Sequence, residues 1–304
     1  MSRNKKISSL NLLIVGLARN CAHVLESEIN KISKSFECFG SLQWLIIESD
    51  SEDNTIQLLE NLNKDNHFNY LSLGRLSTNI PERTKRIAIC RNVYVNQINK
   101  NPKYSKIDYV AIVDLDGVND LLNGTAVETC WDFGVEWDAC FANQLEAYYD
   151  IWALRHDVWS PNDCWAQVRH LVSFGMSAEK AISISVYDRM IEILPEKQPI
   201  KVNSAFGGLG IYKKDLFNEI FYSGLNQYGQ ECCEHVAVHQ SMVEKGAKLY
   251  IYPSLINGSL NEHSSQIKNL SIDQDDLIIL DKAGIKITNI NMDICNSVTF
   301  ATKV

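Results

Sequence analysis

The sequence predicts an α/β fold in which a mainly parallel, Rossmann-like sheet is flanked by helices and forms one large domain. The first observation is that short apolar runs alternate with longer amphipathic stretches through the first half of the chain, as in parallel strands joined by helices. The second is that no linker-like stretch interrupts the 304 residues, and no fixed-period repeat is visible. We therefore expect one continuous sheet.

The first half of the chain alternates expected strands with expected helices. The strands are expected at 11–16, 42–47, 68–73 and 109–113. Asn20 suits the N-cap of a first helix that runs through Ile29. Two more helices are expected at 55–62 and 81–99, the latter with Pro81 in its first turn. Ligands of such sheets bind at the carboxyl ends of the strands, so the residues that follow each strand are candidates for a site.

The second half of the chain is less regular. Strands are expected at 139–143, 209–212 and 248–252, and helices at 166–174, 178–193 and 234–245. The strand at 248–252 closes the part of the chain that shows a clear pattern. The residues after Ser264 give mixed signals, and no element is assigned to them.

Composition and charge exclude several classes of function. Apolar residues make up 45% of the chain and charged residues 22%, as in soluble globular proteins. The formal net charge is −8 and no basic face stands out, which argues against nucleic acid as a partner. No apolar run has the length of a transmembrane helix, and the run at 12–15 is too short for a signal peptide. The nine cysteines lack metal or redox spacing, so we expect reduced thiols in a cytoplasmic protein.

A pair of carboxylates at the end of the fourth strand is the sharpest motif. An extended backbone projects Asp114 and Asp116 to the same side, with Leu115 directed into the core. Two oxygen ligands at a strand end can hold Mg²⁺ or Mn²⁺, and such an ion can neutralise a diphosphate leaving group. The alternative is an acidic turn with Gly117 in a left-handed conformation.

Acidic and hydroxyl side chains also follow the second strand. Glu48, Asp50 and Asp53 could accept hydrogen bonds from a nucleotide base and from ribose hydroxyls. In the alternative interpretation this stretch is a turn, and Ser51 or Asp53 caps the following helix.

The helix expected at 81–99 carries several cations, among them Arg83, Arg86 and Arg91. They could reach a nucleotide phosphate or pair with the acids of the strand-end loops. A solvated basic face is the alternative.

Three further motifs lie in the second half of the chain. Gly207 and Gly208 allow the backbone to approach a ligand closely, or simply form a bend. Glu234 begins a helix and is a candidate general base, although a first-turn glutamate also suits the helix dipole. Trp152 lies in an aromatic stretch that could stack on a sugar or pack in the core, and His263 is a possible metal ligand.

The order of these motifs resembles the nucleotide-sugar glycosyltransferases of the GT-A fold. The stretch 48–55 is similar to the family's Asp-Asp-Gly-Ser-x-Asp-x-Thr loop, with Asp50 in place of the glycine. Asp114-Leu115-Asp116 resembles its Asp-x-Asp metal motif, which implies metal ligation by Asp114, Asp116 and His263. Gly207-Gly208 resembles the glycine pair beside the donor sugar. Glu234 matches the acid that begins the acceptor-side helix, but His235 stands where the family has Asp or Asn.

Several of these motifs together are similar to the Cap59-like mannosyltransferase group. They are Glu48-Ser49-Asp50-Ser51, Arg86 with Arg91-Asn92, Tyr149-Asp150-Ile151-Trp152-Ala153-Leu154-Arg155, Phe206-Gly207-Gly208 and Cys233-Glu234-His235. This resemblance implies a role in the assembly of capsules and surface polysaccharides, and it does not identify the donor. We expect a UDP- or GDP-sugar as donor and a glycan or lipid-linked acceptor. We also expect peripheral association with the inner face of a membrane.

The resemblance assigns roles to further residues and parts of the chain. Glu48, Asp50, Asp53, Arg86, Arg91, Asp114, Gly207 and Gly208 are assigned to the nucleotide sugar, and Asp150, Trp152 and His235 to the acceptor or the sugar. The transferase domain is expected at 8–263, divided into a nucleotide-binding part at about 8–118 and an acceptor part at about 119–263. The tail at 264–304 has no assigned role.

Three other classes of protein make different predictions for the same sequence. A sugar-nucleotide pyrophosphorylase needs a glycine-rich loop after its first strand, whereas the stretch 15–20 has one glycine. A dinucleotide-binding dehydrogenase needs Gly-x-Gly-x-x-Gly there, which is absent. A sugar-binding or scaffold protein without activity predicts loss of the metal-site acids, yet Asp114 and Asp116 are both present. We therefore expect a metal-dependent glycosyltransferase.

Overall fold

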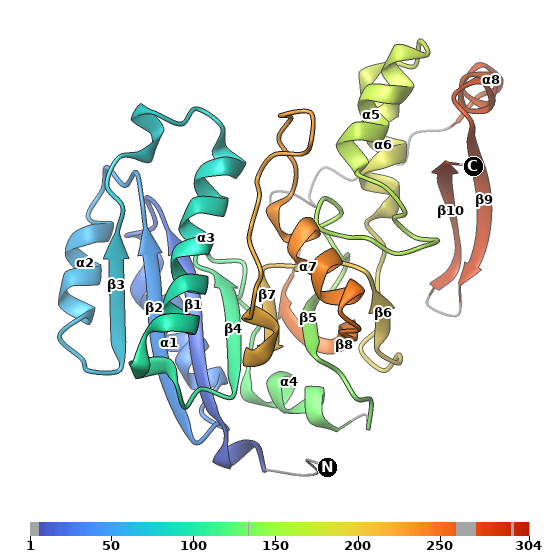
Figure 1. Ribbon diagram of the computed structural model, residues 1–304. Helices are drawn as coiled ribbons and strands as arrows, with labels where there is room; N and C mark the ends of the chain where they lie inside the picture. The colour runs from blue at the N-terminus through green and yellow to red at the C-terminus, as the bar shows by residue number, and fades with distance from the viewer. Residues whose placement is uncertain (1–5, 133, 260–271, 293–294, 304) are drawn as a thin grey trace.

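A mixed sheet of eight strands forms the centre of the protein in a computed structural model, which describes residues 6–132, 134–259, 272–292 and 295–303 (Figure 1). Its strands are β1 (Asn11–Ala18), β2 (Ser41–Glu48), β3 (Phe68–Ser72), β4 (Tyr109–Asp114), β5 (Ala139–Gln144), β6 (Ile200–Val202), β7 (Leu209–Lys213) and β8 (Leu249–Gly258). Their order in the sheet is β3-β2-β1-β4-β7-β5-β8-β6.

Most neighbouring strands run in the same direction. The pairs β2–β3, β1–β2, β1–β4 and β5–β8 are parallel. Strand β7 is antiparallel to both β4 and β5, and β6 is antiparallel to β8. The carboxyl ends of β1 to β5 and of β8 therefore lie at one edge of the sheet, and the loops that follow these strands meet there. The α/β prediction, with a mainly parallel sheet flanked by helices in a single domain, is confirmed.

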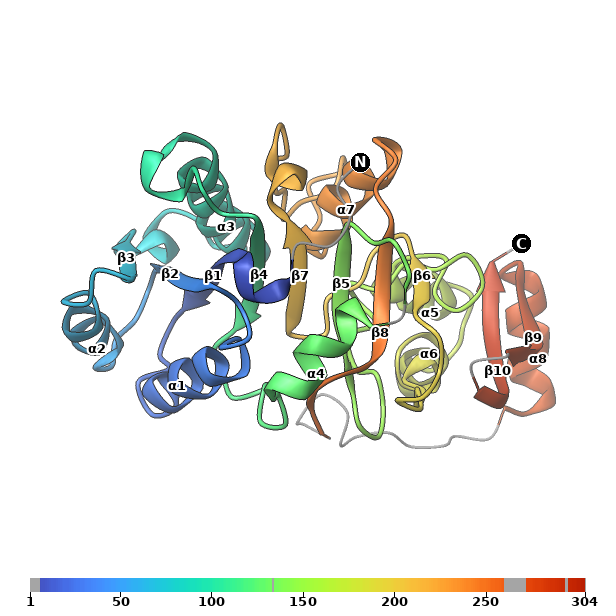
Figure 2. The ribbon, with the colours of Figure 1, turned by 90° about the horizontal axis from the view of Figure 1, so that it is seen from below.

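Helices cover both faces of the sheet (Figure 2). They are α1 (Leu25–Ser35), α2 (Thr55–Leu62), α3 (Arg83–Lys100), α4 (Gly124–Glu128), α5 (Cys164–Ser173), α6 (Ala178–Ser185) and α7 (Glu234–Glu244). Helices α3 and α7 lie on one face, and α1 and α4 lie on the other. Within the described residues, no helix combines the length and apolar character needed to cross a membrane.

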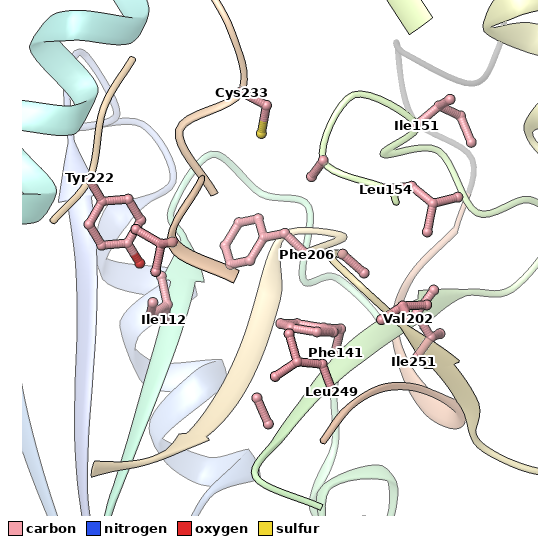
Figure 3. Close-up of a cluster of buried hydrophobic side chains, with 14 of the residues drawn as sticks. Ile112, Phe141, Ile151, Leu154, Val202, Phe206, Tyr222, Cys233, Leu249 and Ile251 are labelled. Carbon is pink, nitrogen blue, oxygen red and sulfur yellow. The ribbon is translucent and has the colours of Figure 1, made fainter. Parts of the chain in front are cut away.

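The two faces of the sheet have separate hydrophobic cores. The first core packs β-strands against α3, α5, α6 and α7, and the second packs them against α1, α2 and α4. Strand β1 contributes to both, since Leu13 and Val15 belong to the first core while Leu12 and Ile14 belong to the second. Burial on both faces explains why this strand is a continuous apolar run. Figure 3 shows part of the first core, including Phe141 and Phe206.

Two predicted helix boundaries are wrong, and tertiary contacts explain both. Asn20 does not cap α1, which begins at Leu25; it has a left-handed φ of 51° and its side chain accepts the N–H of Glu52. The helix expected at 178–193 ends at Ser185. The carbonyls of residues beyond that point are occupied by other segments: Trp159 donates to the carbonyl of Arg189, for example.

The tail without a predicted structure adds a helix and a hairpin. Helix α8 (Gln274–Lys282) begins with a capping box formed by Asp273 and Asp276. Lys180 of α6 reaches both of these carboxylates, at 2.7 and 2.6 Å, and thereby links α8 to α6. Strands β9 (Ile285–Met292) and β10 (Cys295–Lys303) form a separate antiparallel sheet.

Candidate active site

A cavity of about 320 Å³ lies at the edge of the sheet where the parallel strands end. It is lined by the loops after β1, β2 and β4, by α3, and by the beginning of α7. Such a position is the usual ligand site of an open α/β sheet, and the volume is in the range of small-molecule sites. Ten candidate residues from the sequence line it: Asp50, Arg83, Arg86, Arg91, Asp114, Asp116, Asp150, Trp152, Glu234 and His235.

The carboxylates of Asp114 and Asp116 both reach this cavity. Asp114 is the last residue of β4 and is half-buried, Asp116 is exposed, and Leu115 between them packs in the second core, as the alternation of an extended chain predicts. Burial, and after it the charge of Asp116, raises the pKa of Asp114 well above its ordinary value. Asp150 and Glu234 raise this pKa further, while Arg91 lowers it. Several carboxyl groups therefore lie close together at the end of β4.

The carboxylate oxygens of this cluster are the kind of ligand that a divalent cation prefers. Mg²⁺ and Mn²⁺ prefer oxygen ligands, and Mg²⁺ commonly takes one or two carboxylates and completes its shell with phosphate and water. Asp114 and Asp116 provide such a pair. The described ranges of the chain contain no group of three or more His, Cys, Asp or Glu side chains arranged to hold a metal. His263, predicted as the third ligand, lies outside the described residues.

Glu234 is held in place by Arg91, 143 positions earlier in the sequence. The Nε of Arg91 donates to Oε1 of Glu234 at 2.8 Å, and both side chains are buried. The guanidinium also lies over the rings of Phe206 and Tyr222, at 5.4 and 5.7 Å from their centroids, and donates to the hydroxyl of Tyr94. Arg91 thus joins α3 to the first residue of α7 and fixes the position of the Glu234 carboxylate.

The glycine pair before β7 packs tightly behind the carboxylates. Gly207 and Gly208 have φ of +68° and +82°, a region that favours glycine. The carbonyl of Gly208 accepts the N–H of Asp114 at 2.9 Å, and the N–H of Gly207 donates to Asp150 at 3.1 Å. A Cβ on Gly208 would lie 2.5 Å from Cγ2 of Val118. These glycines are absent from the cavity lining, but they position Asp114 and Asp150, which are part of it.

The three acids that follow β2 have different surroundings. Glu48 is fully buried, where its carboxylate accepts the N–H of Ser51 and the hydroxyl of Ser72. Asp53 accepts the N–H groups of Ala22 and Thr55, and neither Glu48 nor Asp53 lines the cavity. Both side chains therefore stabilise loops, whereas Asp50 reaches the cavity.

Asp50 occupies a left-handed backbone position with φ of 64°, where the similar glycosyltransferase loop has glycine. Its Oδ1 accepts the N–H of Ser77 at 2.8 Å, and its Oδ2 lies 3.5 Å from the Nε of Arg86. Burial would raise the pKa of Asp50, but the hydrogen bonds from Ser77 and the charges of Arg86 and Arg19 lower it. Asp50 is therefore ionised at neutral pH and is held by two neighbouring segments.

The residues assigned to the acceptor or sugar line the same cavity as Glu234. His235 is buried and its ring stacks on Phe206 at 4.1 Å. Burial and the charge of Arg91 lower the pKa of His235 well below its ordinary value, so its imidazole is neutral. Trp152 is half-buried, with its indole N–H donated to Asp163 at 3.1 Å. Both rings line the cavity and leave it with an apolar wall beside its carboxylates.

Sequence reasoning missed several residues of the cavity, and Arg19 is the most informative of them. It directly follows β1, at the same edge of the sheet as Asp114. The rule that directs attention to the residues after each strand applies to Arg19 as well, so a signal was present in the sequence. Phe206 and Cys233 belong to both the first core and the cavity wall. The sequence showed them only as neighbours of Gly207 and Glu234 in the recognised motifs, without a role of their own.

Comparison with known proteins gives only distant structural similarity. No protein-family model and no curated protein matches the sequence. The structure is similar to that of S. aureus TarS 1–349 in complex with UDP-GlcNAc, with a TM-score of 0.47 and 13% identity over 90% of this chain and 66% of that one. It is also similar to the mannosyltransferase PcManGT from Pyrobaculum calidifontis in complex with GDP-Man and Mn²⁺, with a TM-score of 0.41 and 12% identity over 81% of this chain and 55% of that one. The present chain thus spans less than two thirds of the length of either.

Proposed function

We propose that this protein is a glycosyltransferase that moves a sugar from a nucleotide diphosphate donor to an acceptor hydroxyl and uses a divalent cation. The observation that carries the proposal is that Asp114, Asp116 and Glu234, far apart in the sequence, converge on one cavity at the carboxyl edge of the sheet. A strand-end carboxylate pair suits a cation that binds a diphosphate, and a helix-borne carboxylate nearby suits an acceptor hydroxyl.

The donor side of the proposed site consists of the carboxylates and cations at the ends of β1, β2 and β4. Asp114 and Asp116 would hold Mn²⁺ or Mg²⁺, with His263 as a third ligand. The cation would neutralise the negative charge that develops on the departing diphosphate. Asp50, ionised and fixed by Ser77 and Arg86, would accept hydrogen bonds from the nucleoside. Of the three acids after β2, Asp50 is the one positioned to do so, because it lines the cavity.

The acceptor side of the proposed site centres on Glu234. Its ion pair with Arg91 fixes its orientation. In an inverting reaction it would take the proton of the acceptor hydroxyl, and in a retaining reaction it would position that hydroxyl. Trp152 would supply a ring surface against which a sugar can pack, and His235, whose ring stacks on Phe206, would support this wall of the cavity. The nucleotide-binding part at 8–118 and the acceptor part at 119–263 would thus each contribute one wall.

The more specific part of the proposal rests on the resemblance of the sequence to the Cap59-like mannosyltransferases. It assigns the enzyme to the assembly of surface polysaccharides or glycoconjugates. The donor that we propose, a UDP- or GDP-sugar, does not rest on this resemblance. The acceptor would be a glycan or a lipid-linked glycan, presented to a protein that associates peripherally with the inner face of a membrane. The aromatic and carboxylate lining of the cavity supports a polar, sugar-containing ligand.

A screen of thermal stability with nucleotide sugars tests the function. We expect one UDP- or GDP-sugar to raise the melting temperature in the presence of Mn²⁺, because a ligand that binds only the folded state stabilises it. The Asp116→Asn variant should lose the Mn²⁺-dependent part of this shift and most of its donor turnover. Asp215→Asn is a matched control, since Asp215 is an exposed carboxylate after β7, at the opposite edge of the sheet. A folded Asp116→Asn protein with undiminished turnover would contradict the metal assignment.

A further inference from the structure

Two arginines of the cavity, Arg19 and Arg83, are exposed and form no ion pair with a described carboxylate, although the charge of Arg83 lowers the pKa of Glu231. Both line the cavity. Among the residues that the structure describes, no carboxylate lies within ion-pair distance of either guanidinium. The charge of Arg19 still acts on this site, because it contributes to the lowered pKa of Asp50.

The other two arginines of the cavity are already engaged. Arg91 is paired with Glu234 at 2.8 Å. Arg86 lies 3.5 Å from Asp50 and donates to the carbonyls of Ile80 and Pro81 at 2.7 and 2.8 Å. The positive charge that remains available to a ligand in this part of the cavity therefore belongs to Arg19 and Arg83.

The loop that carries Arg19 is held in one conformation by the loop after β2. The N–H of Asn20 donates to the hydroxyl of Ser51 at 3.2 Å, and its side chain accepts the N–H of Glu52 at 2.7 Å. The next two backbone N–H groups donate to Thr55 and Asp53, at 3.0 and 3.1 Å. These contacts stabilise the left-handed φ of 51° at Asn20. A backbone conformation that costs free energy and is held by several polar side chains is typical of a functional loop.

The position of Arg83 is also unusual for a cation. Arg83 is the first residue of α3, and the first turn of this helix contains Lys85 and Arg86 but no acid. The positive end of a helix dipole disfavours cations and favours anions. Glu231 meets part of this preference, because its carboxylate accepts the N–H and the hydroxyl of Thr84, both at 3.0 Å, and its pKa is lowered partly by the charge of Arg83. Arg83 also lines the cavity, where a bound anion could approach its guanidinium.

We propose that Arg19 and Arg83 bind the diphosphate of the donor, and that Ser51, Asp53 and Thr55 act as positioning residues that hold the Arg19 loop. This inference rests on the proposed function, which supplies the diphosphate. Arginine binds phosphate oxygens through paired hydrogen bonds, and two arginines from different segments can hold two phosphoryl groups. Asp53 then has a structural task on the β1 loop instead of a contact with the nucleoside.

The affinity for ligands without metal tests this assignment. Isothermal titration calorimetry in EDTA would measure binding of UDP, GDP, the two nucleosides and inorganic pyrophosphate to wild type, Arg19→Gln and Arg83→Gln. We expect each substitution to weaken diphosphate and pyrophosphate binding by roughly tenfold or more, because a hydrogen bond between charged groups is lost, and to leave nucleoside binding unchanged. Arg169→Gln is the matched control, since Arg169 is an exposed arginine on α5 away from the cavity lining.

A double-mutant cycle tests whether Asp53 positions the Arg19 loop or contacts the nucleoside directly. Asp53→Ala should weaken diphosphate binding, and adding it to Arg19→Gln should cause little further loss, because both changes remove the same contact. Weaker nucleoside binding by Asp53→Ala would overturn the positioning role. If Arg19→Gln and Arg83→Gln bind the diphosphate as tightly as wild type does, the inference is wrong and the proposed function is unaffected. Failure of wild type to bind any of these ligands, with or without Mn²⁺, would overturn both.

Discussion

The loops that follow β2 and β4 are both rich in carboxylates and lie at the same edge of the sheet, yet they use these carboxylates differently. After β2, Glu48 and Asp53 accept hydrogen bonds from nearby N–H and hydroxyl groups and have none of their surface in the cavity. After β4, Asp114 and Asp116 reach the cavity and their charges repel each other. The number of acids in a loop therefore says little about its chemistry. What distinguishes the carboxylates assigned to ligand binding is that they line the cavity, even where the fold also supplies a donor, as Ser77 does for Asp50.

The largest expected effect is on turnover and comes from the loop after β4. Asp114→Asn should lower donor turnover by roughly a hundredfold or more, as expected when a charged group that stabilises a transition state is lost. The same change should leave the metal-free protein about as stable as wild type at neutral pH. Burial and the charges of Asp116, Asp150 and Glu234 raise the pKa of Asp114 to about 8, so this carboxyl group is already mostly uncharged there. Steady-state kinetics and urea unfolding measure the two effects. A less stable Asp114→Asn protein would show that this carboxylate supports the fold, as those after β2 do.

The second effect concerns the backbone behind Asp114. Gly208→Ala should destabilise the protein by roughly 3 kcal/mol, because it combines an unfavourable positive φ with a close contact to Val118. Gly229→Ala is the control: Gly229 also has a positive φ, of 75°, but no atom lies within 4 Å of its added Cβ. That variant should lose only about 1 kcal/mol. If urea unfolding shows the same loss of unfolding free energy for both variants, the close contact between Gly208 and Val118 does not contribute to stability.

The third effect tests the structural role of the loop after β2. Glu48→Gln should cost about 1–3 kcal/mol of stability, since a buried acceptor of the Ser72 hydroxyl and the Ser51 N–H is altered. Turnover per folded molecule should change little. Urea unfolding measures the stability of the variant, and steady-state kinetics measure its turnover. Glu48→Gln should lose mainly stability, whereas Asp114→Asn should lose mainly turnover. A large loss of turnover at unchanged stability would assign Glu48 to the nucleoside instead.

The smallest effect is a dependence of stability on pH. The pKa of Asp50 is lowered in the folded protein, so its contribution to stability is complete above the pKa of the unfolded chain and is lost as the pH falls through the folded value. The difference in stability between wild type and Asp50→Asn should therefore be largest near neutral pH and should shrink in acid. A difference that grows in acid would have the wrong sign for a carboxylate held by Ser77 and Arg86.

Local patterns were sufficient to predict most of the fold. The apolar runs gave strands close to their observed bounds, and the helix at Thr55–Leu62 was predicted at its observed ends. Asp114 and Asp116 could be recognised because an abrupt change from apolar to acidic residues marks a strand end. The short elements β6 and α4 were not predicted, since three to five residues carry too weak a periodicity. The end of α6 was also missed, because the backbone beyond it is held by partners distant in the sequence.

The sequence by itself determined the alternation of strands and helices, and it placed acidic residues after β2 and β4, because both follow from periodicity over neighbouring residues. Only the tertiary structure decided which of these charges remain available to a ligand. Arg91 is taken by Glu234, and Asp53 is taken by the backbone of Ala22, whereas Arg19 is left exposed in the cavity. The physical reason is that a charge is neutralised by whatever the fold brings within a few ångströms, and those partners lie 31 to 143 positions away in the chain.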